Sequence, residues 1–230
     1  MPGNGKDDGR TKRWAAHRDQ RRAELVLAAV RAIDRHGPDA SIADIAAEAG
    51  VSKPVLYRYF ADKDELHVAV GQWGAREVLA RMVPALGSDA PMRERIAEAT
   101  DAYLATLEEH PQVFLLLVRH RGADALADGK AEIAATFARF LGDTLRDLGI
   151  DAAGAEPWSH GLVGLGLSTG EWWLERRTMS RAAVAQYLSA FVWHALDGAA
   201  TDLGVPLSAV DHPSAAPSPA AATPIRRKKS

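Results

Sequence analysis

The sequence contains no cysteine, and this absence excludes several kinds of site. Without thiols there is no disulfide framework, no thiolate metal site and no cysteine nucleophile. No apolar run approaches the roughly 20 residues that a membrane-spanning helix needs. The polar start MPGNGKDDGR also lacks the apolar stretch of a secretory signal. We therefore expect a cytoplasmic protein without membrane contact.

Motifs for catalysis and for cofactors are missing as well. No serine lies in the strand-to-helix G-x-S-x-G turn of a hydrolase, and no H-E-x-x-H pair is present. A glycine string runs from Gly164 to Gly170, but no strand precedes it, as a nucleotide-binding loop requires. We expect no cofactor, no metal ion and no enzyme activity.

Strict alternation of apolar and polar residues is absent too, whereas apolar residues recur at spacings of three and four. This pattern predicts an all-α fold of about nine helices. We expect a helix-turn-helix domain over residues 19–67 and a helical body over residues 68–200. Composition predicts a disordered basic arm at residues 1–18 and a disordered, Ala/Pro-rich basic tail at residues 201–230.

The net charge of -2 hides an asymmetry along the chain. Residues 1–63 carry 12 Lys/Arg against 9 Asp/Glu, whereas residues 64–222 carry 12 against 21. A basic amino-terminal end and an acidic body orient a protein toward phosphates. The charge pattern therefore favours a nucleic-acid partner for the first 63 residues.

One stretch, SIADIAAEAGVSKPVLYRYFADKDEL, combines the features of a DNA-reading motif. Ser41 and Asp44 have the spacing of a helix amino-terminal cap. Gly50 suits the left-handed turn at a helix end, and Ser52 with Pro54 suits the start of a second helix. The helix, glycine turn and helix together predict a helix-turn-helix, whose second helix lies in the major groove.

The same stretch resembles the amino-terminal domain of the tetracycline-repressor (TetR) family almost position by position. The resemblance covers roughly residues 20–67. It implies a homodimer that binds double-stranded operator DNA, with Ser41, Tyr57, Tyr59 and Lys63 at phosphates and Lys53, Pro54 and Val55 at base edges. Arg18, Arg21 and Ser52 lie beside these positions, and we include them. The plain alternative is that these side chains are helix caps and surface residues.

The body is rich in large apolar side chains that predict either a packed core or the wall of an effector cavity. The family usually possesses such a cavity, and the few charges available favour a small, largely apolar, elongated or lipid-like effector. The predicted cavity residues are Trp73, Tyr103, Leu107, Phe114, Leu117, Phe137, Leu141 and Trp172.

The last two helices carry an aromatic and aliphatic face. In the resembling family the last two helices pair with those of a second copy, so this face is expected to form a homodimer interface. The alternative is ordinary core within one chain. The predicted interface residues are Trp158, Leu162, Leu165, Gly166, Tyr187, Leu188, Phe191 and Val192.

These expectations add up to a ligand-responsive DNA-binding regulator, most often a repressor in the resembling family. One alternative is a carrier or enzyme for an apolar compound with a vestigial DNA-binding head. Another is a regulator without any small-molecule effector. If the purified protein holds a lipid tightly but protects no DNA in a footprint, the carrier or enzyme is favoured. If the body has no enclosed cavity, the regulator without an effector is favoured.

Overall fold

Residues 5–119 and 127–209 are described by the structure, a computed structural model of the chain. Within these ranges the chain forms nine α-helices, two short 3-10 helices and no strand, which confirms the all-helical prediction. None of these helices is long and apolar enough to cross a membrane. The α-helices are α1 (Gly5–His36), α2 (Ile42–Glu48), α3 (Lys53–Tyr57), α4 (Lys63–Leu86), α5 (Met92–Glu109), α6 (Pro111–Arg119), α7 (Ala127–Asp147), α8 (Ala155–Arg176) and α9 (Arg181–Asp202).

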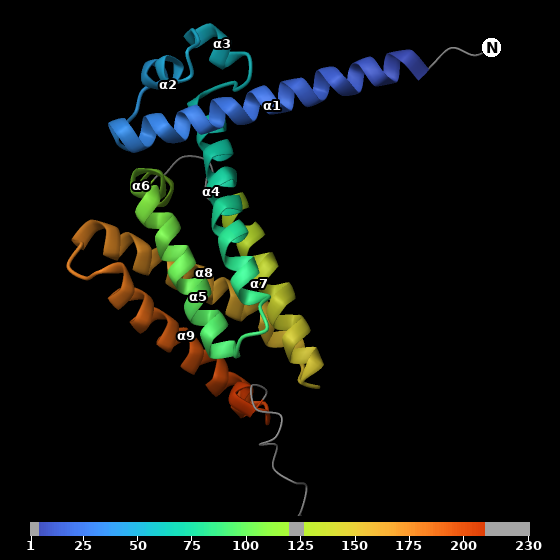
Figure 1. Cartoon of the computed structure of the whole chain (residues 1–230), viewed down its shortest axis with the longest axis vertical. Coiled ribbons are helices and arrows are strands. Elements are labelled where there is room, and N and C mark those ends of the chain that lie inside the picture. The colour runs from blue at the N-terminus through green and yellow to red at the C-terminus, as the bar shows by residue number, and fades with distance from the viewer. Residues whose placement is uncertain (1–4, 120–126, 210–230) are drawn as a thin grey trace, which may run out of the picture.

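The first three helices and the start of α4 form a head at one end of the molecule (Figure 1). Their shared core contains Ile33 of α1, Ile45 of α2, Leu56 of α3 and Leu66 of α4. Each of these side chains is at most 1% exposed. Because burying such a side chain contributes about 1.5–3 kcal/mol, this core fixes the four helices relative to one another.

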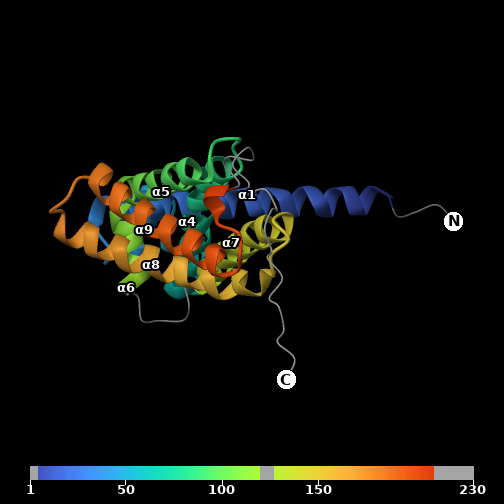
Figure 2. The same cartoon turned by 90° about the horizontal axis from the view of Figure 1, so that it is seen from below.

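The first helix begins at Gly5, so the predicted disordered arm is wrong from residue 5 onward. No proline interrupts residues 5–36, and lysine, arginine and alanine are good helix formers. The added turns project beyond the rest of the molecule (Figures 1 and 2). Trp14, on this projection, is 73% exposed. Residues 1–4 of the arm lie outside the described ranges.

The body consists of α4 to α9, with α4 running from the head along the body (Figures 1 and 2). α4 contacts α1 in the head and α5, α6 and α7 in the body. α6 is the second connection, because its Val113, Leu116 and Leu117 belong to the core cluster of the head. Any movement in the body therefore has two routes to the head.

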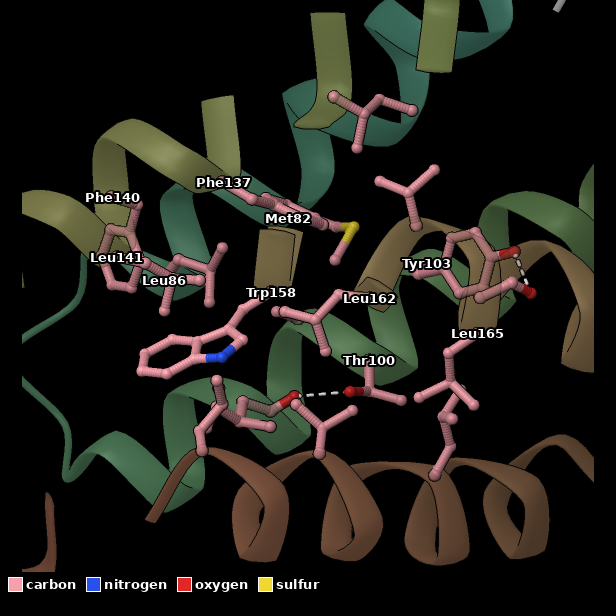
Figure 3. A pocket seen from close by; sticks show the side chains of 18 of the residues that line it. Met82, Leu86, Thr100, Tyr103, Phe137, Phe140, Leu141, Trp158, Leu162 and Leu165 are labelled. Atoms are coloured by element: carbon pink, nitrogen blue, oxygen red, sulfur yellow. Dashed lines mark hydrogen bonds between the residues drawn. The ribbon is translucent and has the colours of Figure 1, made fainter. Parts of the chain in front are cut away.

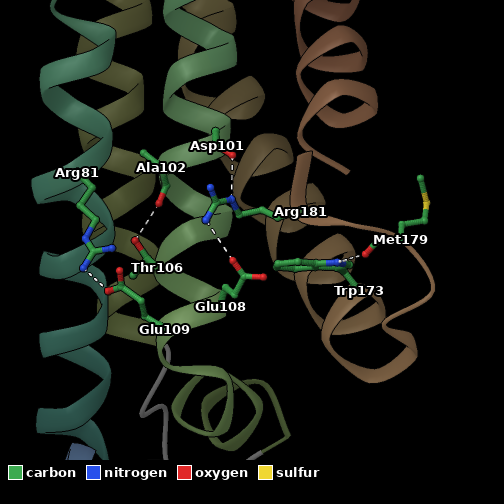
Figure 4. A network of polar contacts seen from close by, with 9 residues as sticks. All are labelled: Arg81, Asp101, Ala102, Thr106, Glu108, Glu109, Trp173, Met179 and Arg181. Atoms are coloured by element: carbon green, nitrogen blue, oxygen red, sulfur yellow. Dashed lines mark hydrogen bonds and ion pairs between the residues drawn. The ribbon is translucent and has the colours of Figure 1, made fainter. Parts of the chain in front are cut away.

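Polar contacts join the last helices to α5 (Figure 4). The guanidinium of Arg181 binds Asp101 at 3.0 Å and Glu108 at 3.1 Å. Both pairs are partly exposed, so each contributes at most about 1 kcal/mol. The turn between α8 and α9 is closed by Trp173, which is 1% exposed and donates its indole N–H to the carbonyl of Met179 at 3.0 Å.

The chain also stays ordered beyond residue 200, so the predicted tail is wrong over residues 201–209. The short helix η2 (Leu207–Ala209) follows α9. Leu207 is 6% exposed and packs in a cluster with Met92 and Trp193. Together with Val205, which packs against a second cluster around Leu145 and Ile150, Leu207 anchors a segment whose overall composition resembles a linker. Residues 210–230, including the basic run RRKK, lie outside the described ranges.

Candidate DNA-binding and effector-binding sites

A short glycine turn joins α2 to α3. Gly50 has a φ of 63°, in the left-handed region that glycine adopts without a steric penalty. The amide of Val51 donates to the carbonyl of Ala46 at 2.9 Å and closes the end of α2. At the start of α2, the Ser41 hydroxyl accepts from the Asp44 amide, and the Asp44 carboxylate accepts from the Ser41 amide. Local chemistry thus builds the helix-turn-helix.

The short helix α3 has one exposed face and one buried face. Lys53 and Pro54 are exposed in its first turn, and Tyr57 is 48% exposed one turn later. Leu56, on the opposite face, is 1% exposed and anchors the helix in the head core. A lysine in this position can donate to guanine O6 and N7, whereas Pro54 and half-buried Val55 offer apolar contact to a thymine methyl.

The remaining predicted DNA-binding residues lie around α3 and on α1. Ser52 is the exposed residue that precedes α3, and its side chain makes no capping hydrogen bond. Tyr59 is half-buried against the head core, and Lys63 is the half-buried first residue of α4. Arg18 is exposed and Arg21 half-buried, both on α1 and outside the helix-turn-helix itself.

Charged contacts hold the helix-turn-helix on α1. Glu48, at the end of α2, accepts hydrogen bonds from Arg31 at 2.9 Å and from Arg35 at 2.7 Å. The bond from Arg31 is the main cause that lowers the pKa of Glu48. The guanidinium of Arg22 lies 4.7 Å from the centre of the Phe60 ring. These contacts and the buried core give α3 a defined orientation on α1.

The body contains a cavity of about 150 Å³ between α4, α5, α7, α8 and α9, which we call the lower cavity (Figure 3). A single water molecule needs roughly 10–15 Å³ of cavity volume, so the lower cavity has room for a much larger molecule. Among the described residues that line it, no side chain is charged.

The three hydroxyl side chains in the wall of the lower cavity all donate to backbone carbonyls. Thr100 donates to Ile96 at 2.7 Å, Thr144 donates to Phe140 at 2.9 Å, and Tyr103 donates to Gly166 at 2.8 Å. Burial raises the pKa of Tyr103, so its hydroxyl stays a neutral donor. The wall therefore presents an almost wholly apolar surface to a ligand.

A second cavity of about 80 Å³, the upper cavity, lies on the head side of the first, between α4, α5, α6, α7 and α8. Its wall includes Val113 and Leu117, which also belong to the core cluster of the head. Its polar wall residues include His110 and Lys130. The upper cavity thus borders directly on residues that hold the head in place.

A chain of contacts leads from the upper cavity into α1. Trp73 and His110 line the cavity, and their rings meet edge to face with centroids 5.0 Å apart. Nδ1 of His110 lies 2.6 Å from a carboxylate oxygen of Asp34 on α1. The other carboxylate oxygen of Asp34 is buried, and no described residue hydrogen-bonds to it. His110 is therefore the polar partner of Asp34 at the junction of head and body.

Comparison with known families decides what this combination of head and body is. Residues 25–70 match the model of the bacterial regulatory proteins of the tetR family, and residues 81–207 match the model of the tetracyclin repressor-like C-terminal domain. The chain belongs to the TetR family. The second match alone covers more than half of the 230 residues. The protein is therefore a TetR-family transcriptional regulator with both characteristic domains.

Relatives of this TetR-family chain are also transcriptional regulators. An uncharacterized HTH-type transcriptional regulator of Mycobacterium tuberculosis is 37% identical over 198 residues, which is 84% of each chain. The HTH-type transcriptional activator FasR of Mycolicibacterium smegmatis is 29% identical over 184 residues, covering 78% of this chain and 84% of FasR. These similarities point to regulators rather than enzymes.

Solved structures share the fold. A TetR-family regulator from Streptomyces coelicolor has a TM-score of 0.67 and 24% identity, covering 84% of this chain and 88% of its own. The regulator FadR from Bacillus subtilis, in complex with stearoyl-CoA, has a TM-score of 0.59 and 17% identity, covering 74% and 96%. Both agree with a helix-turn-helix head on a helical body.

Seven of the eight residues predicted for the effector cavity line a cavity in this TetR-family body, but they divide between two. The lower cavity has Phe137 and Leu141, and the upper cavity has Trp73, Leu107, Phe114 and Leu117. Tyr103 lines both. The prediction for Trp172 is wrong, because this side chain lines neither cavity and is 41% exposed. Neighbouring helix residues lie about 100° apart, and it is Trp173 that points inward.

Residues predicted for the dimer interface are split in a similar way. Tyr187 and Phe191 of α9 are 69% and 63% exposed, as an interface of the free protomer requires. The other six line the lower cavity and so differ from the expected outward placement: Trp158, Leu162, Leu165, Gly166, Leu188 and Val192. One reason is that residues 161–167 of α8, GLVGLGL, are all apolar or glycine, so the sequence there does not distinguish an inward face from an outward face.

Some cavity residues were missed by the sequence reasoning. Val78, Met82 and Leu86 of α4 line the lower cavity at a spacing of four, a pattern that was available in the sequence. Leu207 also lines it, from the segment that composition predicted to be disordered. Residues 166–170, GLSTG, carry the letters of a hydrolase motif but lie inside α8, away from any strand-to-helix turn.

The contact between His110 and Asp34 makes the junction of head and body sensitive to pH. The hydrogen bond that His110 donates to the Asp34 carboxylate is the main cause that raises the pKa of His110 above its usual 6.5, with Glu109 adding to the rise and Arg81 opposing it. Since folding raises this pKa, the contact contributes its full stability below about pH 6.5 and loses it as pH rises through the higher folded value.

We therefore expect the free energy of unfolding of the wild type to fall more steeply above neutral pH than that of His110→Asn. The asparagine amide keeps a donor for Asp34 but does not titrate. Chemical unfolding of both proteins across this pH range measures the difference. Parallel stability curves would show that His110 does not carry the effect.

Proposed function

We propose that this TetR-family protein binds a palindromic operator as a homodimer and that an elongated, apolar effector releases it from DNA. The observation that carries the proposal is the lower cavity, whose wall is free of charged side chains among the described residues and whose hydroxyls all face backbone carbonyls. A site of this kind favours ligands through the burial of apolar area rather than through ionic contacts.

A long acyl chain is the effector class that we propose. Its methylene groups suit a wall built from leucine, isoleucine, valine, methionine and aromatic side chains, and each buried methylene contributes about 0.8 kcal/mol. The FadR structure of similar fold holds stearoyl-CoA, which carries such a chain. In this chain itself, the apolar lining of the lower cavity supports an acyl-chain effector.

The DNA-reading half of the proposal places α3 in the major groove. Lys53, Pro54 and Val55 face base edges, while Ser41, Tyr57, Tyr59 and Lys63, with Ser52, Arg18 and Arg21 nearby, contact the backbone. Two heads of a dimer then read half-sites whose centres are about 34–36 Å apart. An effector releases the operator when it favours a body arrangement that changes this spacing.

The sign of regulation follows from where the operator lies relative to the promoter. We propose repression, in which the bound dimer blocks transcription and the effector relieves the block. One relative is named a transcriptional activator, so the two signs occur among similar chains. A promoter fusion with and without the protein measures which sign applies, and higher expression in the presence of the protein would overturn repression.

The first test is a footprint of the purified protein on the DNA upstream of its own gene, titrated with salt. A protected palindrome with a steep salt dependence is the expected result, because several phosphates are neutralised on binding. Long-chain acyl-CoA thioesters are then added, and loss of protection is expected. Tight acyl-CoA binding without specific DNA binding anywhere in the genome would instead support a carrier with a vestigial head.

Variants of the head separate backbone contacts from base contacts. Lys63→Ala is expected to weaken binding to all DNA sequences and to reduce the salt slope by about one. Lys53→Ala is expected to lower operator affinity about ten-fold, within the 1–3 kcal/mol of a base contact, and to relax the preference at one base pair. Fluorescence anisotropy with operator and single-base variants measures both effects.

The matched control for these two variants is Arg93→Ala, which removes an exposed cation on α5, far along the chain from the head. It should leave both affinity and salt slope at wild-type values. The proposed head contacts are wrong if Lys53→Ala and Lys63→Ala bind operator as the wild type does, or if Arg93→Ala weakens binding equally.

A further inference from the structure

The two cavities of the body meet at a narrow ring of shared side chains, which we call the waist. Both cavities are lined by Val78 of α4, Tyr103 of α5, Ile133 of α7 and the pair Val163 and Leu167 of α8. On α4, α5 and α7, residues to one side of the waist line only the lower cavity, and residues to the other side line only the upper cavity. α8 contributes only the two shared residues to the upper cavity. The cavities therefore lie end to end along α4, α5 and α7.

Helix directions place the upper cavity next to the head. α4 begins in the head at Lys63, and its upper-cavity residues, from Gly71 to Val78, precede its lower-cavity residues, from Val78 to Leu86. α5 runs the opposite way, and its upper-cavity residues, from Tyr103 to Leu107, lead to His110 directly after the helix. A molecule in the lower cavity therefore reaches the contacts around His110 only by passing the waist.

Tyr103 is the polar member of the waist. Its hydroxyl donates to the carbonyl of Gly166 at 2.8 Å, which holds the ring against α8 (Figure 3). Beyond it, a Cβ built on Gly170 would lie 2.6 Å from Leu107 and 2.9 Å from Phe114, so α8 packs closely against α5 and α6. The Tyr103 ring can move aside once its one hydrogen bond is broken, whereas the closely packed backbone of α8 at Gly170 cannot.

We propose that the waist separates effector binding from effector signalling, so that only an acyl chain long enough to pass Tyr103 and enter the upper cavity releases DNA. This inference rests on the proposed function. A short chain fills the lower cavity and binds without effect on the head. A longer chain displaces the Tyr103 ring and reaches Trp73 and His110, and through them Asp34 of α1. The upper cavity is then a length-selective site.

The test uses the full chain and a series of saturated, straight-chain acyl-CoA thioesters of increasing length. Calorimetry measures binding, and anisotropy with labelled operator measures release. Affinity for the wild type is expected to rise by up to about four-fold per methylene, since each buried methylene contributes about 0.8 kcal/mol. Release is expected to begin only above a threshold length. Release that follows occupancy equally at every length would overturn the inference while leaving the proposed function intact.

Gly74→Leu fills the upper cavity. Gly74 lines only that cavity, and a Cβ there would lie 3.7 Å from Leu117, an ordinary contact. Short chains should bind this variant as they bind the wild type, while long chains should lose affinity by ten-fold or more and no longer release operator. The matched control is Ala80→Leu, on an exposed position of the same helix, which should behave as the wild type.

Tyr103→Phe keeps the ring in the waist and removes its hydrogen bond to Gly166. Long chains should then bind about five-fold more tightly, the equivalent of one hydrogen bond of ~1 kcal/mol, while short chains are unaffected.

Equal losses of short-chain and long-chain affinity in Gly74→Leu would overturn the two-part site. If no acyl chain binds the wild type at all, both the proposed effector class and the two-part site are wrong.

Discussion

Replacing both Tyr187 and Phe191 with aspartate is expected to lower operator affinity by about 100-fold or more, because the proposed homodimer separates into monomers. The two residues lie four apart on α9, on the same side of the helix, and are 69% and 63% exposed. Aromatic side chains in such a patch commonly dominate the binding energy of an interface. Aspartates there would have to be buried without partners if the dimer formed.

The size of the effect follows from the two-headed arrangement. When two linked heads bind two half-sites, the second contact is intramolecular, which strengthens binding by about 10²- to 10⁴-fold over one head. Light scattering after size exclusion measures the mass, and anisotropy measures operator affinity. Val83→Asp, at a 45% exposed position of α4, is the control and should remain a dimer. A double variant that stays dimeric would place the interface elsewhere.

The head could be predicted from sequence because local rules determine it. Ser41 with Asp44, Gly50 in the left-handed turn, and Asp62 capping the amide of Glu65 at 2.8 Å are contacts between residues at most four positions apart. A short window of sequence contains all the information for such contacts. α2, α3 and the start of α4 therefore lie where these local signals place them.

The body was predicted less completely because its contacts are long-range. Periodicity finds a helix but not its neighbours, and residues 161–167 of α8 are all apolar or glycine, so they mark no inward face. Trp172 and Trp173 are identical in type and adjacent in sequence, yet one is 41% exposed and the other 1%. Leu207 is buried although its surroundings have the composition of a linker. Only the packing of several helices decides these cases.

The junction of head and body provides the second large effect. His110→Phe is expected to keep effector binding but to lose most of the effector-induced release of operator. Phenylalanine preserves an aromatic ring beside Trp73 but cannot bond to Asp34, so the contact from the upper cavity to α1 is cut. Coupling between sites typically changes affinity by about 5- to 150-fold, and we expect this factor to fall at least five-fold.

Operator affinity with and without saturating long-chain acyl-CoA measures the coupling in the wild type, in His110→Phe and in His110→Asn. The asparagine variant keeps a donor for Asp34 and should retain more of the release than the phenylalanine variant. α6 offers a parallel route through Val113 and Leu117, so some coupling remains in both. If His110→Phe releases operator as completely as the wild type, α6 carries the signal and the contact with Asp34 serves only stability.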